Sequence, residues 1–215
     1  MENFKVNGLI VDKIPGKGKK ILFVHGSNGG SWYFENYMKF FNSKGYEVYA
    51  NNIRGHAPNP DIPNLGTTSV LDYVEDTKAV VNEIKPDIII GHSMGGLISQ
   101  KLAEEFDFKA AAFLASAPPK GVKFRVSKPF AMMWYGMKQI SALRKGLPLK
   151  MIYKMARKFA LNNMTEQEAK KAFEKFVPES SKAGVEVGKD KVVQVDPSKI
   201  KCPVLVVGCK LDNTA

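Results

Sequence analysis

A serine flanked by glycines lies in the segment Gly-His-Ser-Met-Gly-Gly, which runs from Gly91 to Gly96. An apolar run at 88–90 precedes this segment and a helical pattern follows it, so Ser93 is expected on a sharp turn between a strand and a helix. Gly91 and Gly95 avoid a collision on such a turn, and the strained backbone presents the hydroxyl as a nucleophile. The spacing therefore predicts that Ser93 is a catalytic nucleophile. The alternative is an ordinary glycine-rich turn.

A second glycine-rich segment, His-Gly-Ser-Asn-Gly-Gly from His25 to Gly30, follows the apolar run 21–24. A serine that attacks a carbonyl carbon needs an oxyanion hole, built from two backbone N–H groups on different loops. One donor is expected on the residue after the nucleophile and the other on the loop after this strand. We predict that Met94 N–H and Ser27 N–H form this pair. The alternative is that 25–30 is a flexible glycine loop.

Short apolar runs alternate with helical patterns along most of the chain, and these elements must position both loops. The alternation predicts an α/β fold with a mainly parallel sheet and helices on both of its faces. Residues 4–11 are expected to form a strand or one arm of a hairpin, with its turn at 15–18. The other expected elements are strands at 21–24, 48–50, 88–90, 110–115 and 203–207, and helices at 32–43, 69–84 and 96–105.

The alternation stops after the expected strand at 110–115, where a helical cap insertion is predicted. We place this insertion at 119–195, between a core of residues 1–118 and a last core segment at 196–215. The segment 149–159 and the capping box at 165–168 predict helices, whereas 178–191 is polar and is expected to be a return loop. The apolar side chains of the insertion are expected to form its own core or to line an acyl-chain pocket: Phe124, Phe130, Met132, Met133, Trp134, Tyr135 and Met137.

The positive charge of the chain is concentrated in the same insertion. The net charge is +11, and residues 119–191 alone hold 17 Lys or Arg against 6 Asp or Glu, which accounts for the whole surplus. A solvated lysine-rich surface explains this pattern, and so does attraction to an anionic lipid surface or to an acidic ligand. The sequence contains no zinc-ligand spacing and no arginine-rich tract, so nucleic-acid binding is not expected.

The composition and the cysteines indicate the class of protein and its cellular compartment. Apolar residues make up 44% of the chain and no run of 18 of them is uninterrupted, so a globular domain without a membrane-spanning helix is expected. Cys202 and Cys209 flank one expected strand and are too far apart to pair. Free thiols and the lack of a leader pattern favour a cytoplasmic protein.

Together these motifs resemble the α/β-hydrolase superfamily, specifically its serine hydrolases with a helical cap. The resemblance rests on the segments 25–26, 54–56, 91–96 and 203–208, the last of which precedes Asp212. It implies that Asp212 is the acid that orients the catalytic base. It also implies that the base is a histidine further along the chain, after one more strand.

The chain has three histidines, His25, His56 and His92, and all of them precede Ser93. Because the triad of this superfamily runs serine, acid, histidine along the chain, none of the three is expected to be the base. We therefore expect a C-terminally truncated hydrolase that lacks its last strand, its catalytic-histidine loop and its final helix. Such a chain is expected to be nearly inactive on its own.

The expected activity is hydrolysis of carboxylic esters, including lipid-like esters such as monoacylglycerols and lysophospholipids, by a Ser-Asp-His triad. A thioesterase, an amidase, a C–C bond hydrolase and a non-catalytic binding protein of hydrolase ancestry are the alternatives. The expected partners are a small-molecule ester and, weakly, an anionic membrane surface that contacts the basic cap. No metal and no organic cofactor is expected, and the oligomeric state is left open.

Overall fold

A seven-stranded sheet forms the centre of the computed structural model, which describes residues 1–123 and 128–214. The strand order is β1-β2-β4-β3-β5-β6-β7, and every pair from β4 to β7 is parallel. The strands are β1 (Glu2–Val6), β2 (Leu9–Ile14), β3 (Lys20–Val24), β4 (Glu47–Asn51), β5 (Ile88–His92), β6 (Ala110–Leu114) and β7 (Val204–Val207). The helices are α1 (Glu35–Ser43), α2 (Val70–Ile84), α3 (Met94–Ala103), α4 (Pro129–Lys138), α5 (Ile140–Arg144), α6 (Tyr153–Phe159), α7 (Glu166–Phe173) and α8 (Ser181–Val185).

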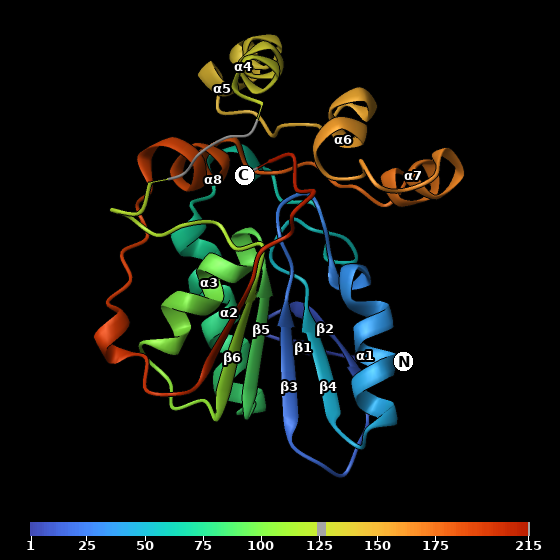
Figure 1. The fold of residues 1–215 in the computed structure, drawn as a ribbon, viewed down its shortest axis with the longest axis vertical. Helices are drawn as coiled ribbons and strands as arrows, with labels where there is room; N and C mark the ends of the chain where they lie inside the picture. The colour runs from blue at the N-terminus through green and yellow to red at the C-terminus, as the bar shows by residue number, and fades with distance from the viewer. Residues whose placement is uncertain (124–127, 215) are drawn as a thin grey trace.

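The centre of the sheet is buried on both faces because β3 and β5 carry uninterrupted apolar runs, at 21–24 and at 88–90. Leu22 and Ile89 pack on one face with side chains of α2 and α3, whereas Ile21 and Ile90 pack on the other face with α1. Consecutive residues of a strand point to opposite faces, so an uninterrupted apolar run is what such a strand requires. The predicted mainly parallel α/β fold is confirmed (Figure 1).

The N-terminal hairpin differs from its predicted form. β1 and β2 pair antiparallel around Asn7 and Gly8, both of which have positive φ angles of 48° and 81°. Asn-Gly is the dipeptide that a two-residue hairpin turn favours, since both central positions need left-handed backbone. The turn predicted at 15–18 is wrong: these residues instead connect β2 to β3.

The helices α4 to α8 lie beyond the carboxyl ends of the parallel strands (Figure 1). All of them fall within the predicted insertion at 119–195, whose bounds stay predictions. The expectation of a return loop at 178–191 is wrong, because α8 and a following turn of π-helix, Glu186–Asp190, occupy this segment. Its Ser180 caps α8 through the Ala183 N–H and also donates to Thr68 O, which fixes the segment to the core.

Four apolar residues of α4 do not lie in a core, which was one of their two expected roles, whereas Met132 and Tyr135 are half-buried and Tyr135 packs edge-on against Phe159. Phe130, Met133, Trp134 and Met137 are all exposed, and Phe130 exposes 81% of its surface. Phe124 lies outside the described residues. Among the helices that the structure describes, none is long and apolar enough to span a bilayer.

Candidate active site

Ser93 occupies a sharp turn between β5 and α3. Its backbone has φ 53° and ψ −122°, a region that residues with a side chain rarely adopt. The backbone is held there from both sides: Ser93 N–H donates to Leu114 O at 3.0 Å, and Ser93 O accepts from Ala117 N–H at 3.0 Å. The turn therefore stores strain that the loop after β6 maintains, as is found at functional sites.

Glycines surround this turn because neighbouring backbones approach it closely. A Cβ atom on Gly95 would overlap the carbonyl oxygens of Val24 and His25, and one on Gly91 would overlap Gly95 O. A Cβ on Gly26 would lie 2.8 Å from the Ser93 Cβ. The loop after β3 and the start of α3 thus meet directly beside Ser93.

Replacing Gly95 with alanine is expected to destabilise the protein by roughly 1–3 kcal/mol, since the added methyl group must push β3 and α3 apart. Gly136→Ala is the matched control, because Gly136 is also helical but has no atom within 4 Å of an added Cβ. Its stability should stay level or rise by about 0.5–1 kcal/mol. Urea unfolding of both variants measures the difference, and equal stabilities would contradict the packing argument.

The peptide before Ser27 is oriented by His25. The Nε2 of His25 accepts from Ile53 N–H at 3.3 Å, so the ring proton is assigned to Nδ1, which donates to Gly26 O at 2.8 Å. In a trans peptide the C=O and the following N–H point in opposite directions. The Ser27 N–H is therefore directed away from the His25 ring, and Ser27 Oγ lies 3.6 Å from Met94 Sδ.

The second predicted donor, Met94, is the first residue of α3. The N–H groups of a first helical turn have no intrahelical acceptor, and the helix dipole is positive at this end. The structure thus brings Ser27 and Met94 into contact beside Ser93. An oxyanion hole requires two backbone N–H groups that converge on one point, and the role of Ser27 and Met94 in such a pair stays a prediction.

The peptide after Ser27 is fixed at both ends. Its carbonyl oxygen accepts from the Tyr33 hydroxyl at 3.2 Å, and its N–H, which belongs to Asn28, donates to Glu179 Oε2 at 3.2 Å. Asn28 has a left-handed φ of 59°, and its side chain donates to Val177 O at 2.9 Å. The segment that follows α7 thus holds the loop after β3.

Glu179 is the centre of a buried polar cluster that sequence reasoning missed. Its carboxylate accepts from Asn28 N–H, His56 Nε2 (3.1 Å), Tyr73 Oη (2.9 Å) and Ser180 N–H (2.7 Å). A buried carboxylate with four donors is well satisfied. The sequence Pro-Glu-Ser-Ser around it is typical of a polar loop, and no spacing in the sequence distinguishes this glutamate.

His56 and Glu179 form a buried ion pair. The His56 Nδ1 lies 3.0 Å from Arg54 O, so both ring nitrogens face acceptors and both carry protons. Burial alone lowers the pKa of His56, but the charge of Glu179 and its hydrogen bond raise it above its ordinary value. Burial raises the pKa of Glu179, yet the charge and hydrogen bond of His56 and two further donors bring it below its ordinary value.

Asp212 lies in the loop after β7, at the same end of the sheet as Ser93. His92 at the end of β5 and Val207 at the end of β7 both pair with Leu114, so these ends are two strands, or about 10 Å, apart. Around Asp212 the loop is tied to the segment between α6 and α7, because Asn162 donates to Leu211 O at 2.8 Å. The structure thus brings Ser27 into contact with Met94, next to Ser93, and places Asp212 at the same end of the sheet.

None of the three histidines is arranged as a base for Ser93. Burial, reinforced by the charge of His56, lowers the pKa of His25 to about 3, and both of its ring nitrogens are already engaged. His56 is paired with Glu179. The His92 ring packs edge-on against Tyr33, and burial lowers the pKa of His92 against the opposing charge of Asp212.

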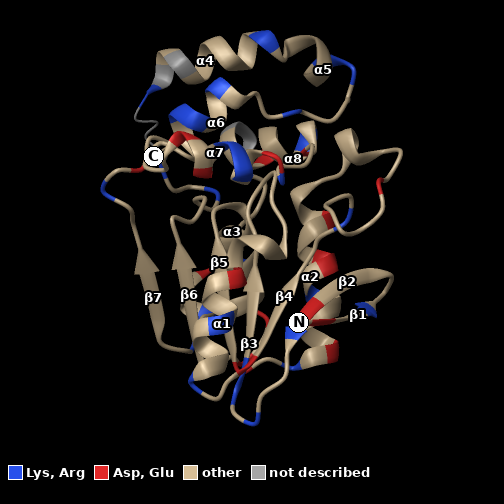
Figure 2. Cartoon of the chain, turned by 90° about the vertical axis from the view of Figure 1, so that its right-hand side faces the viewer, with Lys and Arg blue, Asp and Glu red and all other residues tan. Residues whose placement is uncertain are grey.

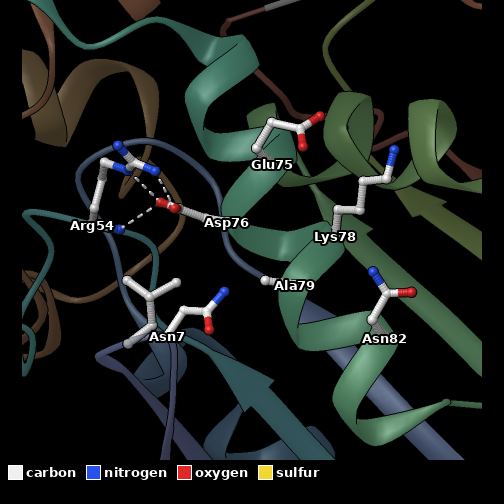
Figure 3. Close-up of a pocket in the computed structure, with 8 residues that line it drawn as sticks. Asn7, Arg54, Glu75, Asp76, Lys78, Ala79 and Asn82 are labelled. Carbon is white, nitrogen blue, oxygen red and sulfur yellow. Dashed lines mark hydrogen bonds and ion pairs between the residues drawn. The ribbon is translucent and has the colours of Figure 1, made fainter.

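A surface groove of about 390 Å³ lies beside α2, and none of the predicted site residues lines it (Figure 3). The Arg54 guanidinium at its rim donates to both oxygens of Asp76, and Arg54 N–H also donates to Asp76 Oδ2. This pairing fixes the loop that carries His56 and leaves Arg54 engaged within the protein. In the described part of the chain, no group of three or more His, Cys, Asp or Glu side chains is placed to hold a metal ion.

A comparison with known protein families identifies the family of this chain. The profile of the family described as serine aminopeptidase, S33, matches residues 17–213, nearly the whole chain. The chain belongs to this family of α/β-hydrolases. The mostly parallel seven-stranded sheet is therefore that of an α/β-hydrolase.

Curated relatives of this α/β-hydrolase include a Mycoplasma genitalium protein named as an esterase/lipase. It is 29% identical over 117 residues, which are 53% of this chain and 43% of that protein. Phospholipase YtpA of Bacillus subtilis is 23% identical over 134 residues, 56% of this chain and 48% of YtpA. The matched segments thus span under half of the length of these relatives.

Solved structures share the fold at low sequence identity. An esterase from Thermogutta terrifontis superposes with a TM-score of 0.68 at 16% identity, covering 96% of this α/β-hydrolase and 79% of the esterase. A bromoperoxidase from Bacillus anthracis gives a TM-score of 0.69, also at 16% identity, with 95% and 80% covered. The likeness extends to proteins named for different activities, so it shows the fold alone.

Proposed function

We propose that this protein is a serine hydrolase of carboxylic esters. The observation that carries the proposal is the strained turn at Ser93, packed against the loop of Gly26 and next to Ser27 and Met94. A hydroxyl on such a turn, with two backbone donors beside it, can attack an acyl carbonyl and stabilise the resulting oxyanion. The relatives named as an esterase/lipase and a phospholipase support an ester as the substrate class.

In the proposed mechanism, Ser93 Oγ loses its proton to a base and attacks the ester carbonyl, which gives a tetrahedral oxyanion. The N–H groups of Ser27 and Met94 donate to this oxyanion. The alcohol then leaves with a proton from the base, and water releases the acid from the acyl-enzyme by the same steps. Asp212 would orient the base and stabilise its charged form.

We propose that the base is a histidine other than the three of this chain. The support is that His25 and His56 are engaged on both nitrogens and that His92 packs against Tyr33. Without the base, turnover should fall by roughly 10⁶, as it does when the base is removed from a serine protease. This chain alone is therefore expected to be nearly inactive. We also propose a cytoplasmic location, since both cysteines are unpaired.

A matched substrate panel tests the ester preference. The full-length gene product is assayed with an ester, a thioester, an amide and an aminoacyl amide that share one acyl group. The expected result is a kcat/KM for the ester that exceeds the others, with lipid-like monoesters among the substrates. A preference for the amide or thioester, or no turnover of any ester, would overturn the proposed function.

A further inference from the structure

Helices α4 and α5 carry a row of exposed apolar side chains. Phe130, Met133, Trp134 and Met137 follow one another at intervals of three, one and three residues, so they share one side of α4. Ile140 extends the row into α5 and is 46% exposed. We name these five residues the α4–α5 face. Figure 2 shows both helices as the outermost layer of the molecule.

A row of this kind is unusual on a protein surface. An amphipathic helix normally turns its apolar side to the core, and contiguous exposed apolar patches mark interaction sites. Here Trp134 is 55% exposed and Phe130 more so. None of the five residues lines the groove beside α2, and all five are exposed to solvent.

The charge around this face is of one sign. From residue 120, after β6, to residue 165 the sequence holds 11 Lys or Arg and no Asp or Glu. Lys138, Arg144, Lys145 and Lys150 are exposed, and none of them forms an ion pair with a carboxylate that the structure describes. The ammonium group of Lys138 lies 5.1 Å from the centre of the Trp134 ring.

We propose that the α4–α5 face rests in the surface of an anionic lipid bilayer. A helix with aromatic residues on one side and basic residues around it lies in the plane of the interface, where apolar groups enter the lipid and lysines meet the headgroups. Charge decides between this occupant and a second copy of the chain. Two such faces in contact would bring Lys138, Arg144, Lys145 and Lys150 of one copy near the same four cations of the other, whereas anionic headgroups complement them. The inference concerns binding and does not depend on the hydrolase chemistry.

Vesicle flotation tests this inference. The wild-type protein is expected to float with vesicles of phosphatidylcholine and phosphatidylglycerol, to bind pure phosphatidylcholine far less, and to be released by salt. The double variant Phe130→Ser, Trp134→Ser should bind the anionic vesicles roughly tenfold more weakly. In a Trp32→Phe background, Trp134 emission should shift to shorter wavelength on binding.

Phe40→Ser provides the matched control. Phe40 on α1 is also 55% exposed, and Lys44 lies 5.6 Å from the centre of its ring, which reproduces the Trp134 and Lys138 pair at a different site. This variant should bind vesicles like the wild type. Equal binding to neutral and anionic vesicles, or equal losses in the two variants, would overturn the proposal. A dimer that the double variant abolishes, without vesicle binding, would assign the face to a second copy.

Discussion

Replacing Ser93 with alanine is expected to abolish ester hydrolysis by the full-length gene product, with a fall in kcat of roughly 10⁶. Labelling by a fluorophosphonate probe should disappear with it, because the probe reacts with an activated serine hydroxyl. The fold should be unaffected, since the turn is held by backbone hydrogen bonds to Leu114 and from Ala117 that the substitution leaves in place. Peptide mapping of the labelled wild-type protein should find the probe on Ser93.

Ser43→Ala is the control for this experiment. Ser43 ends α1 and its hydroxyl donates only to Phe40 O, so the variant should keep full activity and labelling. Ser93→Gly adds a second readout, since glycine adopts a φ of 53° without strain and should raise stability by about 1 kcal/mol over Ser93→Ala. Undiminished labelling of Ser93→Ala would contradict the proposed role of Ser93.

The predictions that succeeded are those in which local sequence dictates local geometry. The uninterrupted apolar run at 88–90 requires a strand that is buried on both faces, and Gly91 and Gly95 leave space for backbones that approach too closely for a Cβ. Ser69 and Asp72 form the predicted capping box at the start of α2, and Thr165 and Glu168 form the other at α7. Such signals extend over a few residues and need no tertiary information.

The cluster around Glu179 could not be predicted in the same way. Its partners Asn28, His56 and Tyr73 lie between 106 and 151 residues away along the chain, and only the folded chain brings them together. A glutamate within a basic, polar segment is more often solvated than buried. The expectation that the apolar side chains of α4 form a core failed for a related reason. An apolar period predicts which residues share one side of a helix but not whether that side faces the core.

Replacing Glu179 with glutamine is expected to destabilise the protein by about 3–5 kcal/mol, the range observed when one partner of a buried ion pair is removed. The variant leaves His56 buried without a counter-charge and weakens the acceptor for Asn28 N–H. We therefore expect the amides of residues 27–29 to exchange hydrogen faster and kcat of the full-length protein to fall while KM changes little. Glu179 is in this sense a positioning residue for the loop that carries Ser27.

Glu186→Gln separates this effect from general damage to the segment. Glu186 is also buried, but it accepts from Ser69 Oγ and Val70 N–H at the start of α2 and, among the described residues, makes no hydrogen bond to the loop after β3. Loss of the Glu186 carboxylate should lower the free energy of unfolding, while hydrogen exchange at residues 27–29 stays at the wild-type rate. Equal acceleration in both variants would contradict a specific role for Glu179.

The ion pair also predicts how stability depends on pH. The raised pKa of His56 means that its contribution is complete below the ordinary value of 6.5 and is lost as the pH rises through the folded pKa above it. The lowered pKa of Glu179 means that its contribution is complete above 4.5 and is lost as the pH falls through the folded pKa below it. The stability difference between wild type and Glu179→Gln should thus be largest between pH 4.5 and 6.5.

Urea unfolding across this pH range measures the coupling between His56 and Glu179, when the wild type is compared with Glu179→Gln, His56→Gln and the double variant. A difference that is flat with pH would mean that the pair is held by neutral hydrogen bonds and carries no charge.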